Sequence, residues 1–373
     1  MSVQIGAGKQ ILFTIILLFI AFLIIEGIAH ILLMNIQNEC KSHNTKVYYE
    51  VANNFTKGTE EYSDLVDRLC TDLKNLKYID STIRTNAPNQ STITYSINEH
   101  GFRGKSIDLM KPIDEYRIIM VGGSTTFGLG STADEHTIPA YLESLLNEKF
   151  EKNIKVINAG VLAADARAEV YHVENHLIKF DPDLIIVFDG YNDSFNIKLT
   201  DINPDEGFVS NIHLSPLELF VKDNFKILAT PKVIFQYTHD YFQSQYLTDD
   251  VMVKNTEKWL ERWNKTCKLA NEKNFELFVV VQPMLGTSDR TLSEIESDIK
   301  SSKIIRYEKT FKLLNNLGDN IDSLSCPHAD LRHTFDGINE QVFHSQVHTG
   351  DKQNKILAYE ISKNIESIIQ KDM

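Results

Sequence analysis

The chain has 373 residues, 42% of them hydrophobic, and a formal net charge of −13 at pH 7. A chain of this length can bury one large core and still carry a smaller region. The acidic balance argues against a nucleic-acid partner, because binding to phosphates requires clustered Lys and Arg. The four cysteines allow three pairings, one of which joins Cys40 to Cys70 and Cys267 to Cys326; free buried thiols are the alternative.

The first long feature is an almost entirely apolar stretch from Ile11 to Met34. A helix over this stretch, rising about 1.5 Å per residue, is long enough for a hydrocarbon core of about 30 Å. This predicts one transmembrane helix, with Glu26 and His30 on one face and within reach of a mutual hydrogen bond. A cleaved secretory signal is the alternative, with residues 27–29 as its small-residue cleavage site. Lys9 before the helix indicates that the remainder of the chain lies outside the cytoplasm.

Three regions follow from this pattern: residues 1–36 as a transmembrane anchor or signal, 37–114 as a polar membrane-proximal region, and 115–373 as a folded domain. In the middle region, alternation over Thr92–Ile97 predicts a strand. The segment NEHGFRG comes next, and we expect its Phe102 and Arg103 to dock against the domain.

Short apolar segments alternate with amphipathic ones in residues 115–373. The predicted strands are Arg117–Val121, Lys155–Ile157, Leu184–Phe188, Glu276–Val281 and Asp322–Ser325. The predicted helices between them include 139–150 and 257–274. This alternation indicates a parallel sheet covered on both faces, with the site at the carboxyl ends of the strands. The aromatic-rich stretch from about 195 to 250 is either a cap over that site or a helical satellite.

The block YRIIMVGGSTTFGLG carries the first chemical signal, because its apolar run leads through two glycines to Ser124 at a predicted helix start. A hydroxyl after a tight Gly-Gly turn stands clear of the backbone, and the N–H of Ser124 can face an attacked carbonyl. This predicts a serine nucleophile for acyl transfer. The alternative is an ordinary strand-to-helix turn with Ser124 or Thr125 as the N-cap.

Three later blocks supply partners for such a serine. KVINAGVLAADA offers the backbone N–H of Gly160 to an oxyanion, and DPDLIIVFDGYND offers the side-chain amide of Asn192. VHTGDKQNKILAYEI places His348 before a helix, where it can act as general base. Singly, each residue also fits an ordinary turn or helix-start role. Taken together, they predict Ser124 and His348 as catalytic residues and Ser124, Gly160 and Asn192 as the oxyanion hole, with no metal or cofactor.

The four blocks in this order resemble the SGNH hydrolases, also called the GDSL esterases and lipases, from about Tyr116 to the C-terminus. The resemblance implies a three-layer α/β/α sandwich with a parallel, flavodoxin-like sheet. Members usually carry an Asp three positions before the histidine, where this chain has Ser345. The triad acid is therefore absent or supplied from elsewhere, with Asp336 and Asp351 as nearby carboxylates.

The sequence thus predicts a membrane-anchored, extracytoplasmic serine esterase of the SGNH type that hydrolyses an acyl ester through an acyl-enzyme. An O-acetyl group on a surface glycan or lipid is the candidate substrate. An O-acyltransferase that uses the same serine is a second hypothesis. A non-catalytic binding protein on the same fold is a third, because the usual acid is missing.

Overall fold

The computed structural model describes residues 6–37, 60–80, 83–195, 228–230, 233, 248–302 and 304–371. Internal contacts divide the chain into two units, one of residues 1–42 with 212–245 and one of residues 43–211 with 246–373. The boundaries expected after residues 36 and 114 stay predictions. Most of the expected insertion at about 195–250 lies outside the described residues.

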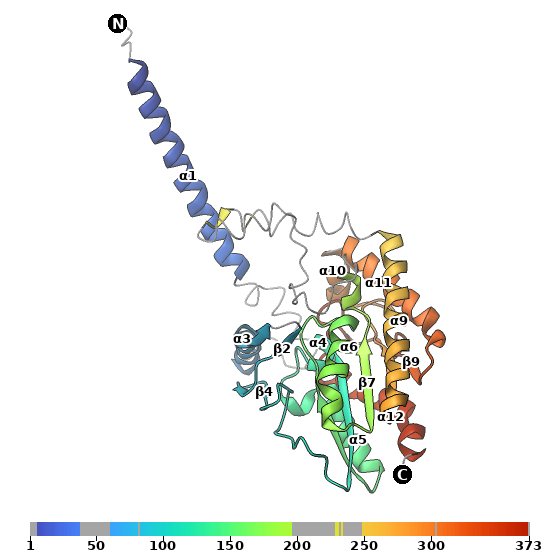
Figure 1. Ribbon diagram of the computed structural model, residues 1–373. Helices are drawn as coiled ribbons and strands as arrows, with labels where there is room; N and C mark the ends of the chain where they lie inside the picture. Colours follow the sequence, from blue (N-terminus) through green and yellow to red (C-terminus); the bar gives the residue numbers. More distant parts are fainter. Residues whose placement is uncertain are drawn as a thin grey trace. The chain divides into compact units, whose positions relative to one another are not determined.

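The first unit contains helix α1 (Ala7–Gln37), which takes up the apolar N-terminal stretch (Figure 1). Within it, Ala7–Leu32 is long and apolar enough to cross a membrane. Large apolar side chains such as Phe13 and Leu18 are exposed along this helix. Exposed apolar side chains on a helix of this length suit a lipid environment better than water.

Two polar residues interrupt α1, and both have partners. The His30 ring Nδ1 lies 3.0 Å from the carbonyl oxygen of Glu26 and 3.5 Å from its carboxylate. The Glu26 carboxylate also accepts from the backbone N–H groups of Ala229 and Thr230 and from the Thr230 hydroxyl. The expected contact between Glu26 and His30 therefore forms, and a second chain segment adds donors to the same carboxylate.

The second unit is built on a five-stranded parallel sheet with the order β6-β5-β7-β8-β9. The strands are β5 (Glu115–Gly122), β6 (Asn153–Asn158), β7 (Leu184–Asp189), β8 (Glu276–Val281) and β9 (His328–Asp330). The continuous apolar runs of β5, β7 and β8 are typical of strands that are covered on both faces. All of β7 is buried, for example.

Four of the five predicted strands are confirmed, and the one at Asp322–Ser325 is wrong. That stretch begins as a short 3₁₀ turn, η5 (Ile321–Ser323), and the strand forms only at His328–Asp330. Pro327 stands directly before it, and its carbonyl accepts from the N–H of Val279 at 3.0 Å. Proline accepts in this way but has no N–H to donate, which suits the start of an edge strand such as this one.

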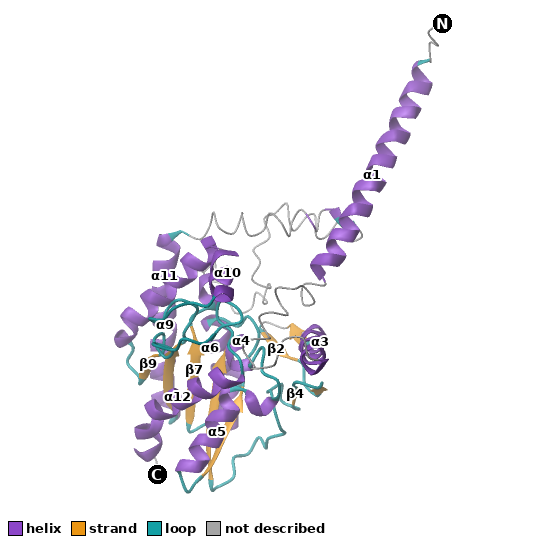
Figure 2. Cartoon of the chain, turned by 180° about the vertical axis from the view of Figure 1, so that it is seen from behind, coloured by secondary structure: helices purple, strands orange, loops and turns teal. Residues whose placement is uncertain are grey.

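Helices cover both faces of the sheet. Helices α5 (Ile138–Lys149) and α12 (Asp351–Lys371) pack together on one face, as Figure 2 shows. Helices α6 (Ala166–Asn175), α9 (Asp249–Lys273) and α11 (Ile304–Asn320) cover the other, which faces the viewer in Figure 1. The shorter elements are α3 (Glu60–Asn75), α4 (Ser124–Phe127), α10 (Glu294–Ser302), η2 (Asp134–His136), η3 (Leu177–Phe180) and η4 (Asn192–Phe195). The predicted three-layer α/β/α architecture is confirmed.

Side-chain caps explain where several helices begin. Thr137, Asp165 and Thr248 precede α5, α6 and α9, and each accepts a hydrogen bond from a backbone N–H three residues later. Such caps satisfy donors that have no partner inside the helix. Helix α9 ends at Asn274, whose left-handed φ of 60° stops the helix before β8.

Before the sheet, the chain forms two short antiparallel pairs, β1 (Tyr78–Asp80) with β2 (Arg84–Asn86) and β3 (Gln90–Ser91) with β4 (Ser96–Ile97). The continuous strand predicted over Thr92–Ile97 is therefore wrong in its first part. The N–H of Thr92 donates to the carbonyl of Tyr95 at 2.9 Å, which closes a turn between β3 and β4. The alternation of apolar and polar residues over 92–97 is compatible with a short hairpin as well as with one continuous strand.

A disulfide between Cys267 and Cys326 ties α9 to the segment before β9. This confirms one of the expected pairs. Cys70 is also disulfide-bonded, and Cys40, its expected partner, lies outside the described residues. The covalent link holds the last strand of the sheet beside the helix that covers it.

The strand order fixes the position of the site. Strand β5 lies between β6 and β7, so the chain leaves β5 first toward one side of the sheet and later toward the other. In an open parallel sheet, such a reversal leaves a crevice at the carboxyl ends of the strands. Ser124, Gly160 and Asn192 follow β5, β6 and β7, respectively.

Candidate active site

Ser124 is the first residue of α4, directly after β5 and a Gly122-Gly123 turn. A Cβ on Gly122 would lie 2.1 Å from Thr126 Oγ1 and 2.5 Å from the carbonyl oxygen of Phe188. A Cβ on Gly123 would lie 2.4 Å from the side-chain nitrogen of Asn192. Both positions therefore require glycine for close approach, which brings Ser124 and Asn192 to the same place.

His348 reaches Ser124 from the other end of the chain. Its Nε2 lies 2.7 Å from Ser124 Oγ, although the two residues are 224 positions apart. Backbone bonds hold the loop before α12: the N–H of His344 donates to the carbonyl of His348 at 3.0 Å, and the N–H of Leu285 donates to that of Gln346 at 2.8 Å. The structure thus brings the predicted nucleophile and the predicted base into hydrogen-bond contact.

The other ring nitrogen of His348 faces a hydroxyl. Ser345 Oγ lies 2.7 Å from Nδ1, at the place where a triad carboxylate would stand. Asp351 accepts from the N–H and hydroxyl of Thr132 and pairs with His136. The Asp336 carboxylate accepts from the N–H of Asp289 at 2.7 Å. Among the described residues, the side chain that contacts Nδ1 is therefore Ser345, and neither Asp336 nor Asp351 does so.

Burial dominates the electrostatics of this histidine. It lowers the pKa of His348 to about 3, and the neighbouring His344 ring acts on that pKa in the same direction. The two rings stack with centroids 5.8 Å apart. Burial also lowers the pKa of His344 to about 4. Both rings are consequently neutral at pH 7.

Two hydrogen-bond donors, the Ser124 N–H and the Asn192 side-chain amide, are available at the Ser124 hydroxyl. The Ser124 N–H is in the first turn of α4, where backbone donors have no partner inside the helix, and no acceptor for it occurs among the described residues. The side-chain nitrogen of Asn192 donates to the carbonyl of Ala164 at 2.6 Å, which fixes the amide and leaves its second hydrogen available. These groups are the kind that stabilise an oxyanion.

Gly160 packs closely against the nucleophile helix. A Cβ there would lie 2.2 Å from the backbone nitrogen of Phe127 and 2.7 Å from its Cα, so only glycine fits. Its N–H donates to the side-chain oxygen of Asn158 at 3.1 Å in this structure. Its part in an oxyanion hole stays a prediction, whereas its close packing is a second reason for glycine at this position.

The predicted docking of Phe102 and Arg103 is confirmed. The Arg103 side chain contacts the C-terminal end of α4, the helix that begins with Ser124. Its guanidinium donates to the carbonyls of Phe127 and Gly128 at 3.0 and 2.9 Å, at the end of α4. It also pairs with Asp134 at 2.8 Å. Because the Arg103 side chain is 2% exposed, these bonds form out of water and hold the C-terminal end of α4.

Sequence reasoning missed other residues that support the site. Asn158 donates to the carbonyl of Phe127 at 3.2 Å, and Gln282 accepts from the Thr125 hydroxyl at 2.8 Å. Tyr191 donates to the side chain of Gln346, in the His348 loop, at 2.9 Å. Asn158 ends one buried strand and Gln282 follows another. A polar residue at the carboxyl end of a buried strand is the sequence pattern that could have identified both.

A buried group of four carboxylates lies next to the Asn192 block: Asp165, Glu169, Asp189 and Asp193. The indole N–H of Trp259 donates to Asp189 at 2.9 Å. Burial raises the pKa of Asp189 to about 6 and raises the pKa values of Glu169 and Asp193 well above their usual range. Within the described part of the chain, no three His, Cys, Asp or Glu side chains are arranged to hold a metal ion.

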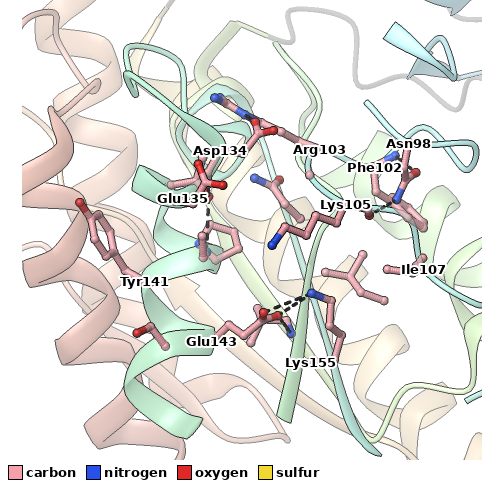
Figure 3. A pocket seen from close by; sticks show the side chains of 18 of the residues that line it. Asn98, Phe102, Arg103, Lys105, Ile107, Asp134, Glu135, Tyr141, Glu143 and Lys155 are labelled. Atoms are coloured by element: carbon pink, nitrogen blue, oxygen red, sulfur yellow. Dashed lines mark hydrogen bonds and ion pairs between the residues drawn. The ribbon is translucent and has the colours of Figure 1, made fainter. Parts of the chain in front are cut away.

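A cavity of about 490 Å³ lies along the edge of β6 that does not pair with β5, and it is lined by Phe102, Lys105, Tyr141 and Lys155 among others (Figure 3). Ser124, Asn192 and His348 do not line it. In its wall, Glu143 of α5 accepts from the N–H of Val156 at 2.8 Å. The cavity is therefore separate from the contact between Ser124 and His348.

No protein-family model and no curated protein sequence matches the chain. Similar solved structures include the acetyl xylan esterase AlAXEase, with 13% identity, coverage of 67% of this chain and 99% of that chain, and a TM-score of 0.39. Axe2, an acetylxylan esterase from Geobacillus stearothermophilus, has 12% identity, coverage of 67% and 94%, and a TM-score of 0.39. A protein from Desulfitobacterium hafniense, described as lipolytic and of the G-D-S-L family, has 10% identity, coverage of 67% and 99%, and a TM-score of 0.38.

Proposed function

We propose that the chain is a serine esterase of the SGNH type that hydrolyses an acyl ester through an acyl-enzyme. One observation carries the proposal: Ser124 Oγ and His348 Nε2 lie 2.7 Å apart at the carboxyl ends of the parallel strands. A serine in contact with a histidine base is the minimum required for nucleophilic acyl transfer. The donors beside it add the means to stabilise the charge that develops.

The proposed reaction uses this chain's own groups throughout. Ser124 Oγ attacks the ester carbonyl while His348 Nε2 takes the hydroxyl proton, and the resulting oxyanion accepts from the Ser124 N–H and the Asn192 amide. His348 then gives the proton to the leaving alcohol as the carbon–oxygen bond breaks. Water then attacks the acyl-enzyme carbonyl while His348 takes one of its protons. The bond between the carbonyl carbon and Ser124 Oγ breaks, His348 returns the proton to Oγ, and the carboxylic acid leaves.

The proposed setting is the outer side of a membrane. The apolar length of α1 supports an anchor in the bilayer. The disulfide between Cys267 and Cys326 supports an oxidising compartment for the domain, because cytosolic thiols are kept reduced. In this setting we propose an ester on a surface glycan or lipid, such as an O-acetyl group, as the substrate.

The test is hydrolysis of p-nitrophenyl acetate by the full chain in detergent, compared with Ser124→Ala. A matched control is Ser131→Ala, at a buried serine after α4 that is outside the proposed reaction. We expect turnover by the wild type and by the control, and none above background by Ser124→Ala. Equal rates for the wild type and Ser124→Ala on acetyl and longer acyl esters would favour a non-catalytic binding role instead.

A further inference from the structure

We propose that Ser345 is a positioning residue that holds His348 in the tautomer with its hydrogen on Nε2, so that the resting histidine donates to Ser124. The catalytic consequence rests on the proposed esterase function, whereas the tautomer itself does not. The inference comes from the hydrogen bonds of one hydroxyl group. This hydroxyl orients the His348 ring in place of a carboxylate.

The Ser345 hydroxyl has one hydrogen and two lone pairs. Its oxygen accepts from the backbone N–H of His348 at 3.0 Å and from that of Val347 at 3.3 Å. These two donors occupy both lone pairs. Among the described residues, the acceptor that remains for the hydroxyl hydrogen is His348 Nδ1, at 2.7 Å. The hydroxyl therefore donates to Nδ1, and Nδ1 carries no hydrogen.

The ring has only one other position for a hydrogen. A neutral imidazole carries one N–H, and hydrogen bonding at one nitrogen sets the tautomer. Burial lowers the pKa of His348 and so favours the neutral ring. With Nδ1 as acceptor, Nε2 bears the hydrogen and donates to Ser124 Oγ across the 2.7 Å contact. In the resting state Nε2 therefore donates to Ser124, whereas a general base must accept the Ser124 proton at that nitrogen.

This tautomer lowers reactivity without disturbing the geometry. Before His348 can take the Ser124 proton, its own hydrogen must move from Nε2 to Nδ1, and the Ser345 hydrogen must turn away from the ring. An Asp at position 345 has no hydrogen to donate when ionised, so it would accept from Nδ1–H and leave Nε2 free. In serine proteases, an amide in place of the triad carboxylate fixes the wrong tautomer and lowers kcat about 10⁴-fold.

The experiment is a two-bond ¹H–¹⁵N NMR correlation on the full chain in detergent, with ¹⁵N-labelled histidine, at pH 7. The spectrum of His348→Gln assigns the His348 signals among the 12 histidines. We expect an unprotonated Nδ1 and a protonated Nε2 in the wild type. Ser345→Thr keeps a hydroxyl and should give the same pattern, whereas Ser345→Asp should place a hydrogen on Nδ1. Unchanged signals from the other histidines show that each variant is folded.

A hydrogen on Nδ1 of wild-type His348, or an equal mixture of tautomers, would overturn the inference. Activity is a second and separate readout. With p-nitrophenyl acetate, we expect Ser345→Asp to raise kcat at pH 7 by a factor between about 10 and about 10⁴. If the NMR patterns are as expected but no variant turns over ester, the tautomer assignment stands and the esterase function fails.

Discussion

The GFRG segment before the sheet should control the stability of the nucleophile helix, and Arg103→Met tests this. Methionine keeps much of the apolar volume but removes every donor. Asp134 then loses its cation, and the carbonyls of Phe127, Gly128 and Thr94 lose the N–H groups that now lie 2.6–3.0 Å away. Few of these groups can turn to water, because the Arg103 side chain is 2% exposed.

The expected loss in the free energy of unfolding follows from the type of interaction that Arg103→Met removes. Removing one partner of a buried ion pair costs about 3–5 kcal/mol. Because the Asp134 side chain is 22% exposed and keeps its hydrogen bonds from Ser96, we expect the lower end of this range, about 3 kcal/mol. At about 2–4 °C per kcal/mol for a domain of this size, the melting temperature should fall by roughly 10 °C. Since two of the bonds end on α4, we also expect kcat for p-nitrophenyl acetate to fall.

The assay is thermal unfolding of the full chain in detergent, followed by intrinsic fluorescence. Lys149→Met is the matched control: its pair with Glu366 lies at the surface, and such pairs contribute about 0–1 kcal/mol. We expect a shift of at most a few degrees for the control. A melting temperature of Arg103→Met that equals that of Lys149→Met would refute the role assigned to the buried guanidinium.

Three further predictions concern the oxyanion donor, a buried histidine and the disulfide. Asn192→Ala should lower kcat for p-nitrophenyl acetate about 10²–10³-fold, as expected for a lost oxyanion donor; an unchanged kcat would remove Asn192 from the reaction. Burial lowers the pKa of His344 from 6.5 to about 4, so the unfolded chain takes up a proton that the folded chain refuses as pH falls through this range. The wild type should lose about 3 kcal/mol of stability between pH 6.5 and pH 4 relative to His344→Gln, and parallel curves of melting temperature against pH for the two proteins would contradict this. Replacing both Cys267 and Cys326 by Ser opens a loop with a sequence separation of 59, which should cost about 4 kcal/mol by loop entropy; an unchanged melting temperature would show that the crosslink does not restrain the unfolded chain.

The sequence was sufficient for the central sheet, because β5, β7 and β8 are continuous apolar runs and buried parallel strands have that composition. It failed for β9, whose three residues, His-Ala-Asp, carry no apolar run. It also failed for the turn between β3 and β4, where alternating residues fit both a strand and a hairpin. Tertiary contacts rather than local pattern place these short edge elements.

The site was predictable as a set of residue types but not as a hydrogen-bond network. Ser124 and His348 each follow recognisable local patterns, and the fold brings them to 2.7 Å. The direction of the bond between Ser345 and His348 depends on two backbone N–H groups that no spacing reveals. The bond from Gly160 to Asn158 is likewise a matter of loop conformation.

The central claim is that Ser124 is an acyl-accepting nucleophile that His348 activates. The most direct measurement is labelling of the full chain with a fluorophosphonate, followed by digestion and mass spectrometry to locate the adduct. We predict an adduct on the peptide that contains Ser124, slower labelling in His348→Gln, and no adduct in Ser124→Ala. Absence of labelling in the wild type, or an adduct that persists in Ser124→Ala, would contradict the account.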